Sequence, residues 1–78
     1  MHPGEEPHFE AAVLALRQAA KADPEDVAIL CNLATSLTAC YRHDAAVRVY
    51  DAALVYDAND LHSMNGMAVS LIGLMQFD

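Results

Sequence analysis

The chain has 78 residues, of which 55% are hydrophobic, with only three glycines and three prolines. This composition indicates one small globular domain rich in helix, and it argues against a disordered segment. Eleven acidic residues against four basic ones leave a net charge of -7, which repels phosphate backbones and anionic headgroups and so disfavours nucleic acids and membrane surfaces as partners.

The first predicted helix runs from about Glu6 to Ala22. Pro7 falls in its first turn, where a missing N–H carries no penalty. Its apolar residues recur at spacings of three and four positions, as one face of a helix requires. They are Phe9, Ala12, Val13, Leu16 and Ala19.

The second predicted helix begins in the segment Asp23-Pro24-Glu25-Asp26. We expect Asp23 to cap this helix and Pro24 to occupy its first position, with the following acids near the positive end of the helix dipole. The helix then runs from about Pro24 to Cys40.

A turn at residues 41–43 precedes a third helix from Asp44 to about Tyr56. Residues 57–60 repeat the capping segment and open a fourth helix, from about Asp60 to Met75. Connections of three to five residues make consecutive helices antiparallel neighbours. The third helix is expected to pack through Ala46, Val49, Tyr50 and Ala53, and the helices to approach closely at Ala34, Ala46, Ala53 and Ala68.

The sequence repeats itself with a period of 34 residues. Ten of the 44 comparable pairs (78 minus 34) are identical, more than an alanine-rich composition alone would give. The identical pairs are Ala11-Ala12-Val13 with Ala45-Ala46-Val47, Ala19 with Ala53, Asp23 with Asp57, Asp26 with Asp60, Ala34 with Ala68, Ser36-Leu37 with Ser70-Leu71, and Asp44 with Asp78.

These features resemble the tetratricopeptide repeat family, whose unit is a 34-residue helical hairpin. Residues 27–60 resemble one complete unit, residues 6–22 the second helix of a preceding unit, and residues 61–78 the first helix of a following unit. The resemblance implies a single all-α domain over residues 1–78, with four helices stacked as antiparallel hairpins in a short right-handed α-solenoid. It is carried by Asn32-Leu33-Ala34, Leu37, Ala46, Tyr50, Ala53-Leu54 and Asp57, and in the fourth helix by Met64, Met67-Ala68 and Leu71.

Three residues depart from the family's preferences. Leu30 stands in place of tryptophan, Ala58 in place of proline, and Tyr41 in place of the glycine that normally turns the chain between the two helices. A tyrosine at positive φ costs about 1 kcal/mol. We therefore expect either a strained turn at Tyr41 or a turn of another shape.

The resemblance also implies a binding groove, because the first helices of successive units in this family line a concave surface that binds peptides or partner helices. The matching positions are Cys31, Asn32, Thr35, His62, Asn65, Val69 and Ile72, with Ala28, Thr38, Ala39 and Gly66 beside them. Asn32 and Asn65 suit a peptide backbone, since an amide offers both donors and an acceptor. The alternative is that both amides only face water or stabilise a neighbouring helix. No lysine or arginine occupies the groove, which disfavours acidic peptide tails.

Large apolar residues surround most of the fourth predicted helix, more than one neighbouring helix can cover. They are Leu61, Met64, Met67, Val69, Leu71, Ile72, Leu74 and Met75. The next helix of a longer array would cover them. Alternatively the helix docks on a second copy, and Leu61, Leu74 and Met75 are the candidate contacts.

Other chemistry is disfavoured. Cys31 and Cys40 lie on opposite faces of one predicted helix, about 13 Å apart, so they cannot pair with each other. A zinc site needs four converging ligands, which the spacing of Cys40 and His43 does not supply. Free thiols, and a start without the features of a signal peptide, favour the cytoplasm.

We therefore expect a cytoplasmic protein-interaction module, an adaptor, scaffold or chaperone-like protein, which binds a protein or peptide in its groove. We expect no enzyme activity, metal or cofactor. The alternative is a structural self-assembly module that oligomerises, or swaps helices, through its uncovered terminal helices.

Overall fold

A computed structural model describes residues 6–76 of the chain, with side chains from Phe9 onward. The described part is all-α, as predicted, and consists of four helices: α1 (Glu6–Ala22), α2 (Val27–Ala39), α3 (His43–Tyr56) and α4 (Leu61–Gln76). The ends of the expected domain, residues 1–5 and 77–78, lie outside the described residues.

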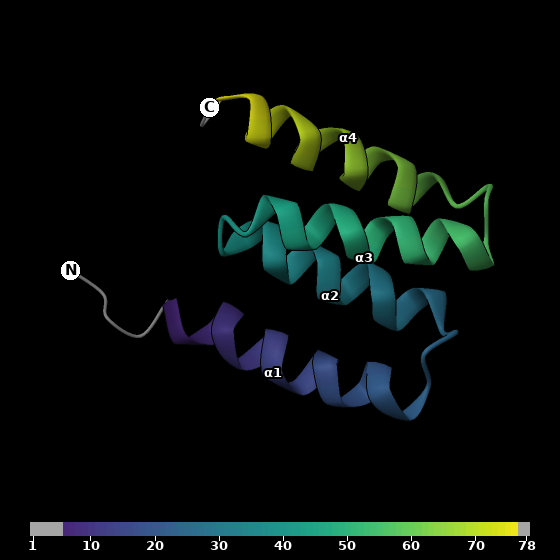
Figure 1. The fold of residues 1–78 in the computed structure, drawn as a ribbon. Helices are drawn as coiled ribbons and strands as arrows, with labels where there is room; N and C mark the ends of the chain where they lie inside the picture. Colours follow the sequence, from purple (N-terminus) through teal and green to yellow (C-terminus); the bar gives the residue numbers. More distant parts are fainter. Residues whose placement is uncertain (1–5, 77–78) are drawn as a thin grey trace.

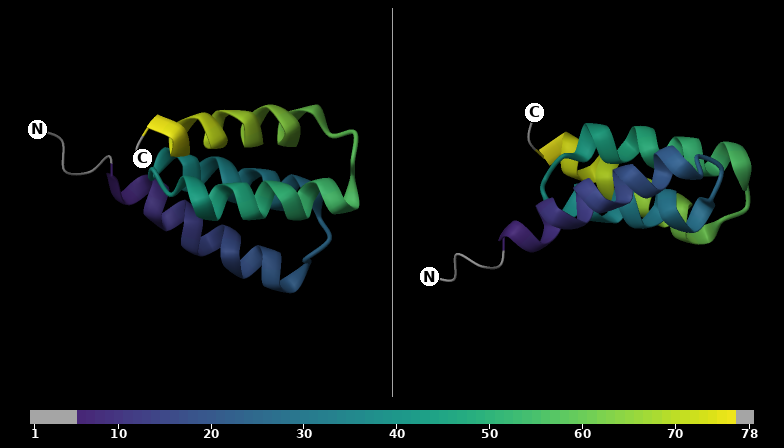
Figure 2. Two further views of the ribbon diagram at one scale, coloured as in Figure 1. Left: turned by 45° about the horizontal axis from the view of Figure 1, so that its top comes forward. Right: turned by 90° about the horizontal axis from the view of Figure 1, so that it is seen from below.

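Consecutive helices run antiparallel, so that α2 and α4 are parallel to each other (Figures 1 and 2). The helices α2 and α3 form a central pair, with α1 packed on α2 and α4 packed on α3. In addition, α2 contacts α4 directly. The helices α1 and α4 are the outer members of the bundle and lie on opposite sides of the central pair (Figure 1).

The core lies mainly between α2 and α3. Ala34 of α2 and Ala46 and Ala53 of α3 are all 0% exposed, which confirms that small residues let the two helices approach closely. The burial of Tyr50 confirms the predicted packing face of α3. The two buried clusters are Val13, Leu33, Ala34, Leu37, Ala46 and Tyr50, and Leu30, Cys31 and Ala53.

The predicted start of α2 is wrong. Asp26, and not Asp23, caps the helix: its Oδ1 accepts hydrogen bonds from the backbone N–H groups of Ala28 (3.0 Å) and Ile29 (3.3 Å). Pro24 lies in the preceding turn, which the bond from Asp26 N to Asp23 O (3.3 Å) closes. Proline suits the second position of such a turn as well as the first position of a helix, and the capping bonds to Asp26 decide between the two.

The 34-residue period of the sequence is also a period of the backbone hydrogen bonds. Three bonds of the α1–α2 turn recur in the α3–α4 turn with nearly the same lengths. The pairs are Asp23 N to Ala19 O with Asp57 N to Ala53 O (both 2.9 Å), Asp26 N to Asp23 O with Asp60 N to Asp57 O (3.3 and 3.2 Å), and Leu30 N to Asp26 O with Met64 N to Asp60 O (both 3.1 Å). The period of the sequence is therefore also present in the backbone of these two turns.

The turn between α2 and α3 is the strained form of the two expected. Tyr41 has a φ of 61°, the only positive φ of a non-glycine residue among those described. The bonds from Tyr41 N to Thr38 O (3.0 Å) and from Arg42 N to Leu37 O (2.9 Å) end α2 in a Schellman motif, in which this position normally holds glycine.

The outer helix α4 packs inward through its smallest residues. Ser63, Ser70 and Gly73 are buried, and Gly66 lies against the ring of Tyr50. Ala68 was expected to meet another helix closely but is exposed, because no helix of the described chain covers that side of α4. The exposed large residues are Leu61, Met64, Val69, Leu71, Ile72, Leu74 and Met75.

Candidate binding face

Most of the predicted groove residues are exposed on α2 and α4, two helices that contact each other. Asn32 and Thr35 of α2 are exposed, and so are the α4 residues His62, Asn65, Val69 and Ile72. Cys31 differs, because its side chain is only 5% exposed and packs in the second core cluster.

Cys31 takes part in a buried hydrogen-bonded cluster at the start of α4. Asp60 Oδ2 accepts bonds from the Ser63 hydroxyl (2.5 Å), the Ser63 N–H (3.3 Å) and the Cys31 thiol (3.1 Å). The Cys31 Sγ also lies 2.8 Å from Ser63 Oγ. This cluster caps α4 and joins it to α2.

The electrostatics of the cluster keep the thiol protonated. Burial, and then the hydrogen bond to Asp60, raise the pKa of Cys31, while the bond to Ser63 opposes them. The hydrogen bond from Ser63, followed by that from Cys31, lowers the pKa of Asp60. Since the thiolate is the reactive form, Cys31 is a structural thiol and a poor nucleophile.

Two further contacts extend this connection along the helices. Thr38 Oγ1 and Ser70 Oγ lie 3.0 Å apart, and Thr35 Oγ1 lies 3.0 Å from the hydroxyl of Tyr50, whose ring packs beneath Gly66. Both threonines also donate to backbone carbonyls one turn earlier on α2. We call this set of residues the polar seam: Cys31, Thr35 and Thr38 of α2, Tyr50 of α3, and Ser63, Gly66 and Ser70 of α4.

The seam was missed at the level of sequence, where Thr35 and Thr38 were assigned only to the groove surface. One signal was present. Small or polar residues recur at helical spacing on α2 (31, 35, 38) and again on α4 (63, 66, 70). Two such stripes on equivalent helices indicate that the helices face each other through them.

A hollow of about 330 Å³ lies where α2 and α4 begin. Asn32 and His62 are exposed at this hollow, while the Asp60 carboxylate is already engaged in the cluster beneath. The lining residues are Val27, Ala28, Cys31, Asn32, Asp60 and His62. Its size places it at the small end of ligand sites, where it suits part of a peptide better than a cofactor.

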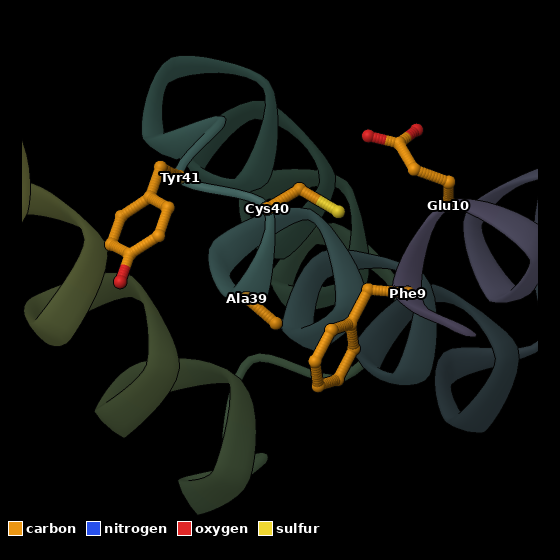
Figure 3. Close-up of a pocket in the computed structure, with 5 residues that line it drawn as sticks. All are labelled: Phe9, Glu10, Ala39, Cys40 and Tyr41. Carbon is orange, nitrogen blue, oxygen red and sulfur yellow. The ribbon is translucent and has the colours of Figure 1, made fainter. Parts of the chain in front are cut away.

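A second hollow, of about 300 Å³, lies at the opposite end of the bundle and was not predicted (Figure 3). It is lined by Phe9, Glu10, Ala39, Cys40 and Tyr41. Phe9, which was predicted to lie on the apolar face of the first helix, is about half exposed at this hollow. Arg42 forms an ion pair with Glu10 (3.0 Å) beside it, in an exposed position where such pairs add little stability.

His43, considered above as a metal ligand with Cys40, is buried against α4. A Cβ atom at Gly73 would lie 2.7 Å from His43 Nε2, so this glycine admits the imidazole ring. Among the side chains that the structure describes, from Phe9 to Gln76, no three His, Cys, Asp or Glu converge in a way that would hold a metal ion.

No protein-family profile, curated protein or solved structure matches this chain. None of the four described helices combines the length and the apolarity that a membrane crossing requires.

Proposed function

We propose that the chain is a tetratricopeptide-type module, a short right-handed α-solenoid, which binds a polypeptide along the face formed by α2 and α4. One observation carries the proposal. The helices α2 and α4 contact each other, and each carries an exposed amide, Asn32 on α2 and Asn65 on α4. Within the described chain, neither amide side chain hydrogen-bonds to another protein group.

The polar seam supports this function by holding the two helices at a set separation. Preorganised donors and acceptors bind a ligand more tightly, because less conformational freedom is lost on association. The two amides supply donors and acceptors for the backbone of the peptide, while Val69 and Ile72 offer an apolar strip beside them.

The charge of this face selects the class of peptide. No residue of α2 or α4 is acidic or a lysine or arginine, and the net charge of -7 resides elsewhere on the chain. An acidic peptide would find no cation here and would be repelled by the remainder of the surface. The preferred ligand is a neutral or basic polypeptide in extended or helical form, and the role is that of a cytoplasmic adaptor, scaffold or chaperone-like protein.

The test is selection of binding peptides from a random library, followed by calorimetry with variants. We expect Asn32→Ala and Asn65→Ala each to weaken binding about fivefold, since one hydrogen bond is worth about 1 kcal/mol net. Gln18→Ala removes an exposed amide from α1 and is the matched control. Binding that is equally insensitive to all three changes would remove the α2–α4 face as the site.

A separate observation favours self-assembly as a second candidate function. The outer helix α4 exposes large apolar side chains along its length, among them Leu61, Leu74 and Met75. Contiguous apolar surface of this kind marks contact sites between proteins. Light scattering over a wide concentration range tests this candidate, and a mass that stays at one chain throughout would contradict it.

A further inference from the structure

The buried contact between α2 and α3 serves as a reference for the outer helices. The buried clusters of the core include Leu30, Ala34 and Leu37 of α2, and Ala46 and Ala53 of α3 with Val49 packed against them. Ala34, Ala46 and Ala53 are completely buried, so the two helices touch through small residues flanked by larger ones.

The same two surfaces recur, uncovered, on the outer helices. A shift of 34 residues from the α2 surface leads to Met64, Ala68 and Leu71 of α4, all exposed; we call them the tail face. The same shift back from the α3 surface leads to Ala12, Ala15 and Ala19 of α1, which we call the head face. Ala15 is exposed, whereas Ala12 and Ala19 are half-buried.

The two faces cannot meet within one molecule. The helices α1 and α4 lie on opposite sides of the central pair (Figure 1), and no contact joins them in the described part of the chain. Each molecule therefore carries both halves of one further α2–α3 contact, separated by its own width.

We propose that the tail face of one copy docks on the head face of the next, so that α4 and the neighbouring α1 form a helical pair like α2 and α3. This proposal rests on self-assembly, the second candidate function, and specifies its partner and geometry. In the docked pair Ala68 takes the place of Ala34, while Ala12 and Ala19 take the places of Ala46 and Ala53.

The side chains around these alanines fit the same arrangement. Leu71 repeats Leu37, and Met64 replaces Leu30 with a flexible side chain of similar size. Leu61 is equivalent to Val27, which packs against the cluster that contains Ala53 of α3, so docking covers this α4 residue as well.

Met75 provides a contrast on the same helix. It is equivalent to Tyr41, which is 77% exposed even though its helix is covered by α3. The proposed contact therefore leaves Met75 outside, unlike a contact that covers the whole of α4.

Charge does not oppose the contact. The helix α4 contains no acidic residue, lysine or arginine, so Glu10, Arg17 and Lys21 of the docking α1 meet no like charge on it. Because the two faces differ, the contact is heterologous and does not close on itself in a dimer, so chains add head to tail.

The test uses one charged substitution on each face, at exposed positions where the fold tolerates it. Ala68→Glu blocks the tail face and Ala15→Glu the head face, and each should raise the dissociation constant of assembly about a hundredfold or more, because a carboxylate would be buried without a partner. Gln76→Glu and Arg17→Gln change the net charge by the same one unit outside both faces and should assemble as the original chain does.

Mixing the two blocked variants gives the decisive measurement. The Ala68→Glu chain retains its head face and the Ala15→Glu chain its tail face, so an equimolar mixture should form a heterodimer that does not grow further. Sedimentation velocity measures this directly, and circular dichroism checks that both variants remain helical. Leu71→Gln on the tail face and Ala15→Gln on the head face repeat the test should either first variant lose its fold.

The remaining outcomes separate the two ideas. If Ala68→Glu abolishes assembly while Ala15→Glu has no effect, α4 pairs with another surface, and the head-to-tail contact is refuted although self-assembly stands. If the original chain remains a monomer at all concentrations, both self-assembly and the head-to-tail contact are refuted, whereas peptide binding on the α2–α4 face is unaffected.

Discussion

Replacing Gly66 with alanine should destabilise the protein, although the same change stabilises most helices. In a helix interior, alanine is favoured over glycine by about 1 kcal/mol. At this position, however, the added methyl group would overlap the Tyr50 ring. The outcome depends on whether that ring can move aside.

The surroundings of Tyr50 indicate that it cannot move cheaply. Its side chain is 3% exposed, packs in the main core cluster and holds Thr35 at 3.0 Å through its hydroxyl. Overpacking of this kind costs about 1–3 kcal/mol. After the gain in helix propensity is subtracted, the free energy of unfolding falls by up to about 2 kcal/mol. Each kcal/mol lowers the melting temperature by about 4–8 °C.

Urea denaturation followed by circular dichroism measures the effect of Gly66→Ala. Asn65→Ala, at the adjacent exposed position of α4, is the matched control and should leave stability unchanged or slightly higher. A gain of about 1 kcal/mol in Gly66→Ala would mean that helix propensity prevails, and it would refute the close packing of α4 on Tyr50.

Three further predictions concern the caps and the thiols. Asp60→Ala should lower the free energy of unfolding at neutral pH, and Asp51→Ala is the control. The pKa of Asp60 is lowered in the folded state, so its stabilising contribution is present above the unfolded-state pKa and is lost as the pH falls through the folded-state pKa. The loss of stability in Asp60→Ala should therefore vanish in acid. Equal deficits at both pH values would contradict this. Tyr41→Gly should stabilise the protein by about 0.5 kcal/mol, because the relief of backbone strain at positive φ exceeds the conformational entropy that glycine loses on folding. Thermal unfolding measures this change, and a loss of stability would exclude strain at this turn. Cys40 should react with iodoacetamide before Cys31, because the buried thiol of Cys31 reacts only when the structure opens. Mass spectrometry of the labelled peptides gives the order of reaction. The reverse order would contradict the cluster of Cys31 with Asp60.

The number and type of the helices could be predicted from sequence because all four carry apolar residues at helical spacing, and because α2 and α4 start beside the acidic caps Asp26 and Asp60. The start of α2 could not, since both Asp23 and Asp26 can cap a helix and Pro24 fits both a helix start and a turn. Only the hydrogen bonds that Asp26 accepts separate these two arrangements.

The inward face of α4 was harder to predict for a different reason. Large apolar residues indicate burial in most helices, yet in α4 most of them are exposed, Met67 being the one that packs against the core, while Ser63, Ser70 and Gly73 are buried. Small residues contribute little to a hydrophobic pattern, so that pattern alone cannot orient this helix. The burial of Cys31 followed from the same contact, because its partner Ser63 lies on the buried side.

The matching turns of the chain have a consequence for protein engineering. Because the turn at residues 23–26 and the turn at residues 57–60 share their hydrogen bonds, residues 27–60 begin and end at equivalent points of the backbone. A second copy of this 34-residue cassette inserted after Asp60 would give a chain of 112 residues (78 plus 34) with unchanged terminal helices. Each inserted cassette should add a nearly constant increment of folding free energy, so the number of cassettes would set both the length and the stability of the protein.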